Sequence, residues 1–122
     1  MPERINFVAL DGVPLIKPGD DLVEIIINAL SLSGESLQDG DVLVLAQKIV
    51  SKAEDRIIDL NTVSPREEAF RIASKIGKDP RQIELVLQES KEIVRSRPGV
   101  VIVEQNLGIV MANAGIDHSN VD

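Results

Sequence analysis

The sequence predicts an α+β fold with a mixed or antiparallel sheet, about three main helices and a C-terminal β-hairpin. Two consecutive helix-start patterns, at 64–67 and 79–82, predict a capped αα-hairpin. Two β-rich segments on either side of Arg97-Pro98-Gly99 predict the β-hairpin. At 122 residues we expect a single domain that buries about two-thirds of its unfolded surface.

Composition limits the functional classes. Hydrophobic residues make up 43% of the chain and aromatic residues only 2%, so the core must be aliphatic and stacking on bases has little support. The net charge of −7 disfavours nucleic acid and anionic membranes as partners, although two lysines and a divalent ion can make one cleft attractive to a mononucleotide. The chain has no cysteine, no signal-peptide core at its start and no apolar run long enough for a membrane span, so we expect a cytoplasmic protein.

The first half of the chain contains segments of both strand and helix character. Residues 5–10 form a short apolar run with β-branched members, which favours a strand. A helix is predicted over 21–32, because the stretch 21–24 has the spacing of a capping box. The continuous apolar run 42–46 is typical of a strand that is buried on both faces, and 57–60 is predicted as a further strand.

The loop 11–20 contains two prolines and two glycines, which exclude regular structure. It is more apolar than a solvated connection needs, since it holds Val13, Leu15 and Ile16. These side chains can cover an edge of the core, or the backbone amides beside them can line a pocket. Both interpretations stay open on the residues alone.

Two lysines, Lys48 and Lys52, follow the apolar run 42–46. Polar residues after a buried strand lie at the edge of a sheet, where α/β proteins commonly bind ligands. If this segment is helical, the four-residue spacing places both ammonium groups on one face, where they could meet one anion. Because the charged residues 54–56 follow directly, a solvated surface is the alternative interpretation.

Two capped helices come next. Ser64 and Asp79 are each followed by proline at the first helical position, and an apolar stripe follows each of them. The first stripe, which ends at Gly77, consists of Ala69, Phe70, Ala73 and Ile76. The second consists of Ile83, Val86 and Leu87. The pair is predicted to pack on the sheet, and nothing in it requires a catalytic explanation.

The last strands are predicted at 91–96, 100–104 and 109–112, separated by short turns. A polar turn follows, on which Asp117 and Asn120 could hold a cation or a phosphate. An Asp in this context most often caps a turn, so a structural role is the alternative. Neither a catalytic triad nor a Gly-rich phosphate loop of standard spacing is present, and we assign no catalytic residue.

Three segments carry a family resemblance: Gly12-Val13-Pro14-Leu15-Ile16-Lys17, residues 40–54, and Asn113-Ala114-Gly115-Ile116-Asp117-His118-Ser119-Asn120-Val121. They resemble the N-terminal part of the coenzyme F420-0:L-glutamate ligase (gamma-glutamyl ligase) family. The resemblance implies a ligase of F420 biosynthesis that joins L-glutamate to coenzyme F420-0 by an amide bond, using GTP and an acyl-phosphate intermediate. It also implies a divalent metal, Mg²⁺ or Mn²⁺, with K⁺ as a further ion, and a homodimer.

The resemblance also implies site residues. Contacts to GTP fall on Val13, Pro14, Leu15, Ile16, Gln47, Lys48, Lys52 and Asn120, and Asp117 becomes the first metal ligand. A carboxylate oxygen suits a hard cation that bridges phosphates, while lysines balance the phosphate charge. Transfer of a phosphoryl group to a carboxylate depends on positioning and charge neutralisation, so neither a triad nor a cysteine nucleophile is needed.

The sequence departs from the family pattern in places. Asp55 stands where the family usually has Gly, and some members carry small hydroxyl residues at the positions of Gln47 and Lys48. The chain ends at Asp122, whereas family chains are longer and supply further metal ligands downstream. We therefore expect a truncated family member that is inactive as a ligase on its own. A non-catalytic nucleotide- or metal-binding module and a purely structural domain are the alternatives.

Overall fold

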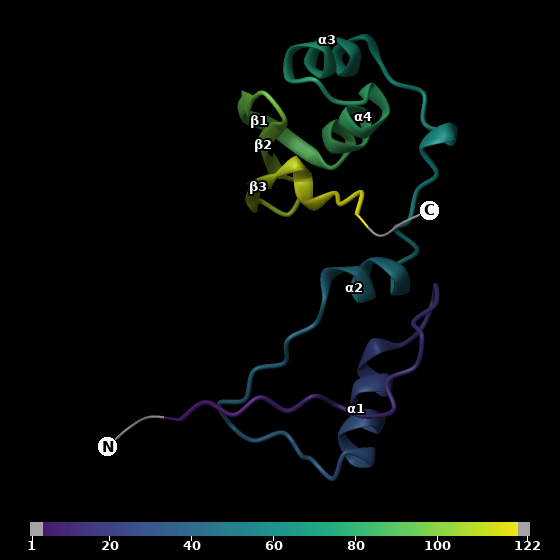
Figure 1. The fold of residues 1–122 in the computed structure, drawn as a ribbon, viewed down its shortest axis with the longest axis vertical. Helices are drawn as coiled ribbons and strands as arrows, with labels where there is room; N and C mark the ends of the chain where they lie inside the picture. The colour runs from purple at the N-terminus through teal and green to yellow at the C-terminus, as the bar shows by residue number, and fades with distance from the viewer. Residues whose placement is uncertain (1–3, 120–122) are drawn as a thin grey trace. The chain divides into compact units, whose positions relative to one another are not determined.

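The computed structural model describes residues 4–119, and the chain forms two compact units, unit 1 (1–57) and unit 2 (58–122), which we describe separately (Figure 1). Residues 4–119 contain four α-helices and a three-stranded antiparallel sheet with the predicted hairpin, which confirms the α+β class. The single domain stays a prediction. None of the helices in this range combines the length and apolar composition that crossing a bilayer requires.

Unit 1 contains two helices, α1 (Leu22–Leu32) and α2 (Gln47–Ala53). The start of α1 is capped as predicted, because the Asp21 carboxylate accepts hydrogen bonds from the backbone N–H groups of Val23 at 2.9 Å and Glu24 at 3.1 Å. The short helix α2 shows that the helical alternative for the lysine-bearing segment is correct.

Strands were predicted at 5–10, 42–46 and 57–60. These predictions are wrong, because within residues 4–119 none of the three segments pairs in a sheet. The run 42–46 is also exposed rather than buried on both faces, since Val44 is 86% accessible. A strand needs a neighbour that satisfies its backbone N–H and C=O groups, and the described part of unit 1 contains no strand that could be this neighbour. Apolar composition alone does not predict pairing.

Unit 2 packs two helices against an antiparallel sheet (Figure 1). The predicted αα-hairpin consists of α3 (Glu67–Ile76) and α4 (Pro80–Gln88). The sheet has the order β1-β2-β3, with strands β1 (Ser90–Arg97), β2 (Val100–Gln105) and β3 (Val110–Ala112). Two short 3-10 helices, η1 (Leu60–Thr62) and η2 (Asn113–Gly115), precede α3 and follow β3.

The core of unit 2 is aliphatic, as the composition predicts. Its buried side chains come from α3, α4 and β2: Ala69, Ile72, Ala73, Ile76, Ile83, Val86, Val101 and Val103. Phe70, which the predicted stripe includes, is 54% exposed, and Ile72 lies in the core instead. Successive helical residues are about 100° apart around the axis, so Phe70 leaves the face on which Ala69 lies.

The first helix of the pair begins later than predicted. The sequence pattern places its cap at Ser64, whereas α3 starts at Glu67 and Arg66 is the N-cap, without a side-chain cap. The cause is Glu84 of α4, which is only 2% exposed. The Arg66 backbone N–H donates to Glu84 Oε2 at 2.9 Å, and Arg66 Nε donates to Oε1 at 2.8 Å. Gln88 Nε2 donates a third hydrogen bond, at 3.0 Å, so the buried carboxylate fastens the start of α3 to α4.

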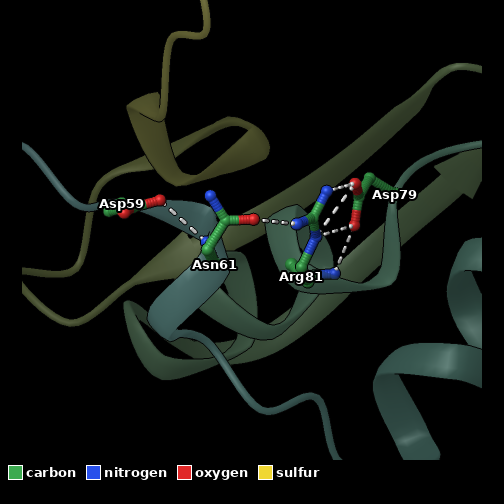
Figure 2. Close-up of polar contacts among 4 residues, drawn as sticks. All are labelled: Asp59, Asn61, Asp79 and Arg81. Carbon is green, nitrogen blue, oxygen red and sulfur yellow. Dashed lines mark hydrogen bonds and ion pairs between the residues drawn. The ribbon is translucent and has the colours of Figure 1, made fainter.

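The second helix has its predicted cap. Pro80 occupies the first turn of α4, and the Asp79 carboxylate accepts from the Arg81 backbone N–H at 2.8 Å. The Arg81 guanidinium binds the same carboxylate, with a closest N–O distance of 2.7 Å, and also donates to Asn61 Oδ1 at 3.2 Å (Figure 2). The Asn61 backbone N–H donates to Asp59 at 2.9 Å. These contacts attach η1 to the start of α4.

We expect Glu84→Gln to lower the free energy of unfolding by about 1–3 kcal/mol at pH 7, because an amide cannot accept all the hydrogen bonds that the buried carboxylate accepts. Urea unfolding followed by circular dichroism measures this change. Glu68→Gln is the matched control, since Glu68 pairs with Arg71 on the surface at 3.6 Å. The control should change stability by less than about 0.5 kcal/mol.

The cost of Glu84→Gln should also depend on pH. Burial raises the pKa of Glu84, but hydrogen bonds from the Arg66 backbone, Gln88 and the Arg66 guanidinium lower it, and the net shift is downward. The carboxylate therefore stabilises the fold above the unfolded pKa of glutamate, about 4.3, and this contribution is lost as pH falls through the lower folded pKa. Unfolding curves in a descending pH series should converge for parent and variant; a constant difference would contradict the assignment.

Candidate functional site

In unit 1 the loop 11–20 and α2 enclose a hollow of about 280 Å³. Most of the residues that the resemblance assigns to GTP line it together: Pro14, Leu15, Ile16, Lys48 and Lys52. Val13 and Gln47 are not among the lining residues. Asn120 lies outside the described residues. The roles of these residues toward a nucleotide stay predictions, but their gathering in one place is a finding.

Backbone contacts at both ends hold the loop in place. At its C-terminal end the Gly19 N–H donates to the Ala53 carbonyl of α2 at 2.9 Å. At its N-terminal end Gly12 has φ +75° and approaches α1 so closely that a Cβ would lie 2.7 Å from Leu32 Cδ1. Between them Ile16 is buried and also lines the hollow, whereas Val13 and Leu15 are exposed, so of the three apolar side chains Ile16 is the one that the structure buries.

Lys48 and Lys52 lie one helical turn apart on α2, and both reach the hollow. Their opposite wall is formed by the apolar residues of the loop. Two ammonium groups beside an apolar wall can neutralise part of the charge of a phosphate group while excluding some water. Ligand pockets for drug-sized molecules measure about 300–1,000 Å³, so the hollow suits one part of a nucleotide rather than a whole one.

The helix α2 ends at a left-handed residue. Asp55 has φ +53°, a conformation that favours glycine, the residue that the resemblance leads us to expect at this position. Asp tolerates this region better than most residues. The turn is closed by hydrogen bonds from Asp55 N–H to the Lys52 carbonyl at 3.1 Å and from Arg56 N–H to the Ser51 carbonyl at 2.7 Å. The substitution therefore leaves a glycine-like turn beside the lysine pair.

In unit 2 a second cavity, of about 180 Å³, lies beside Asp117. Its walls come from Lys78, which precedes α4, from one face of α4 and from the segment 113–118. The polar residues that line it are Lys78, Gln82, Asn113, Asp117 and His118. The cavity was not predicted, because Lys78 reads as an ordinary solvated lysine between two helices and Gln82 as part of a helix-start pattern.

A left-handed turn brings Asp117 to this cavity. Residues 113–115 have φ values of +52°, +53° and +74°. The turn is anchored to β2, because the Val101 N–H donates to Asn113 Oδ1 at 3.3 Å, and it is closed by Ile116 N–H donating to the Asn113 carbonyl at 3.0 Å. Ile116 then packs on the aliphatic core. Asp117 follows directly and is exposed.

The Asp117 carboxylate has the chemistry of a ligand for a hard cation. Its oxygens accept hydrogen bonds from the Ser119 backbone N–H at 2.9 Å and the Ser119 hydroxyl at 2.6 Å, which is the turn-capping role set out as the alternative. Carboxylate oxygens are the ligand type that Mg²⁺ and Mn²⁺ prefer. Within residues 4–119 no three His, Cys, Asp or Glu side chains gather as a metal site, so Asp117 is one candidate ligand.

The electrostatics around the cavity are set by the neighbouring cap of α4. Hydrogen bonds from the Arg81 side chain and backbone lower the pKa of Asp79, and His118 adds a smaller effect in the same direction. Asp79 is therefore a carboxylate that is already paired. Its charge is balanced mainly by Arg81, which lies outside the lining of the cavity.

Comparison with known proteins identifies relatives of one kind. The family model described as F420-0:Gamma-glutamyl ligase matches residues 12–122. The chain is 48% identical over 118 residues to the coenzyme F420:L-glutamate ligase of Methanothermobacter thermautotrophicus, an alignment that covers 97% of this chain and 47% of the relative. The enzyme of the same name from Archaeoglobus fulgidus is 42% identical, with 98% of this chain and 45% of the relative covered. The chain thus spans about half the length of these relatives.

We expect Asp55→Gly to raise the free energy of unfolding by roughly 0.5 kcal/mol, since the relief of left-handed strain exceeds the entropy that glycine loses on folding. Glu54→Gly is the matched control: its φ of −84° suits any residue, so glycine there should be destabilising. Urea unfolding of both variants measures whether each substitution raises or lowers the free energy of unfolding. Equal signs would show that Asp55 carries no strain.

Proposed function

Because the chain belongs to the F420-0:gamma-glutamyl ligase family, we propose that it supplies part of the GTP and metal site of an enzyme that ligates L-glutamate to coenzyme F420-0. The observation that supports this most is the hollow of unit 1, where Pro14, Leu15 and Ile16 meet Lys48 and Lys52. The names of the relatives support an acid–amino-acid ligase of F420 biosynthesis.

The proposed reaction has two steps. The γ-phosphoryl group of GTP passes to a carboxylate of F420-0, which gives an acyl phosphate and GDP. The amino group of L-glutamate then attacks the acyl carbon, the amide bond forms, and inorganic phosphate and a proton leave. Both steps depend on positioning and on neutralising phosphate charge, so the protein needs donors and cations more than a nucleophile.

Each group of the chain has a role in this proposal. Lys48 and Lys52 bind phosphate oxygens, and the loop segment 14–16 forms the wall against which the nucleotide lies. Asp117 contributes a carboxylate oxygen to a divalent ion, Mg²⁺ or Mn²⁺, which supplies further neutralisation of phosphate charge when bound. We also propose, from the resemblance, that the whole protein is a cytoplasmic homodimer and that K⁺ is a further ion.

We predict that Lys52→Ala weakens GTP binding in the presence of Mn²⁺ by about tenfold, the loss expected for one hydrogen bond to a charged group. Asp117→Ala should weaken the dependence of binding on Mn²⁺. Isothermal titration of the chain with GTP measures both effects. Lys75→Ala is the control, because Lys75 lies on the exposed side of α3 and lines neither cavity.

The outcomes separate the candidate functions. Absence of GTP binding by the parent chain would favour a purely structural role and overturn the proposal. Since the chain spans less than half of its relatives, we propose that it binds GTP without adding glutamate to F420-0 by itself. Appreciable glutamate addition, measured with GTP and Mn²⁺, would contradict this. If Lys52→Ala binds GTP as tightly as Lys75→Ala, the assignment of Lys52 to the GTP site is wrong.

A further inference from the structure

We propose that the cavity of unit 2 binds L-glutamate, with the Lys78 ammonium as the contact for one of its carboxylates. The inference rests on the proposed function, because a glutamate ligase needs a place for the amino acid. It goes beyond that function by assigning a subsite, by naming Lys78, and by giving a binding role to Gln82, which the sequence analysis includes only in a helix-start pattern.

The size of the cavity selects the ligand. A volume of about 180 Å³ lies below the range of about 300–1,000 Å³ that drug-sized ligands occupy. It corresponds to the liquid volume of about six water molecules, which suits a free amino acid. A deazaflavin cofactor with several fused rings is too large for it. Of the two carboxylate substrates in the proposed reaction, only the amino acid fits as a whole molecule.

Charge provides the second argument. Lys78 is half-buried at the cavity wall, and its ammonium makes no ion pair or hydrogen bond with another group of residues 4–119. The adjacent carboxylate, Asp79, does not neutralise it, because Arg81 binds Asp79 at 2.7 Å. A half-buried cation whose neighbouring anion is already paired favours an anionic ligand, and a charge-assisted hydrogen bond satisfies it.

The remaining walls match the rest of an amino acid. Ile83 and Val86 are buried and provide an apolar floor for the methylene groups of a glutamate side chain. Gln82, on the same helix, adds an amide that can donate to a carboxylate. Asp117 borders the cavity on the exposed side, so a bound amino acid lies beside the proposed metal ligand.

The test is an NMR titration of the ¹⁵N-labelled chain with L-glutamate, in the absence of nucleotide and metal. We expect saturable shifts of the amide signals of Lys78, Gln82 and Asn113. Lys78→Gln should weaken binding at least about tenfold, and Lys75→Gln, the matched control three residues earlier, should not change it. Gln82→Glu, which adds a negative charge to the cavity, should abolish binding even if Lys78→Gln disturbs the fold. L-Glutamine, which lacks one carboxylate, should bind more weakly than L-glutamate.

Several results would overturn the assignment. These are the absence of saturable shifts, shifts confined to unit 1, equal affinity of parent and Lys78→Gln, or inorganic phosphate that displaces glutamate from the same signals at equal concentration. The test is independent of the nucleotide site, because the titration contains neither nucleotide nor metal. If the chain binds GTP but not glutamate, the proposed function stands and this inference is wrong. If it binds glutamate but not GTP, the glutamate cavity stands and the proposed GTP site is wrong.

Discussion

The buried carboxylate of Glu84 is the interaction on which unit 2 depends. A charge removed from water is costly unless hydrogen bonds compensate it, and Arg66 and Gln88 provide three of them. This pairing decides where α3 begins and therefore which of its side chains meet the core. Because α4 carries both Glu84 and the floor of the cavity, the same contact also fixes the helix on which the proposed glutamate subsite lies.

Local features of the fold could be predicted from the sequence, and non-local ones could not. Asp21 and Asp79 cap their helices through bonds that span two or three residues, and Pro98-Gly99 closes the hairpin in the same local way. The start of α3, by contrast, is set by a residue 18 positions away in the sequence. The run 42–46 has strand composition, yet pairing depends on a neighbour that composition does not reveal.

The candidate site divides in the same way. The spacing of Lys48 and Lys52 predicts a shared face once their segment is helical, and the structure places both at one hollow with the proline-containing loop. Their link to GTP comes from the family resemblance rather than from spacing. Lys78 could not be assigned from the sequence. Its proposed role depends on the ion pair between Asp79 and Arg81, which only the arrangement of side chains shows. The polar turn indicates Asp117 as a possible cation ligand, the resemblance makes it the first metal ligand, and its Ser119 contacts come from the structure.

The left-handed turn at 113–115 has a thermodynamic consequence for the site that follows it. Two of its residues are not glycine, and L-residues in this conformation cost about 1–2 kcal/mol each. The bond from Val101 to Asn113 and the packing of Ile116 must offset that cost, so the turn has a small margin against local unfolding. A ligand held at Asp117 would bind only the closed turn. The free energy of ligand binding would then include the free-energy cost of closing the turn. Hydrogen exchange at the Ile116 amide would slow as the site is saturated with ligand.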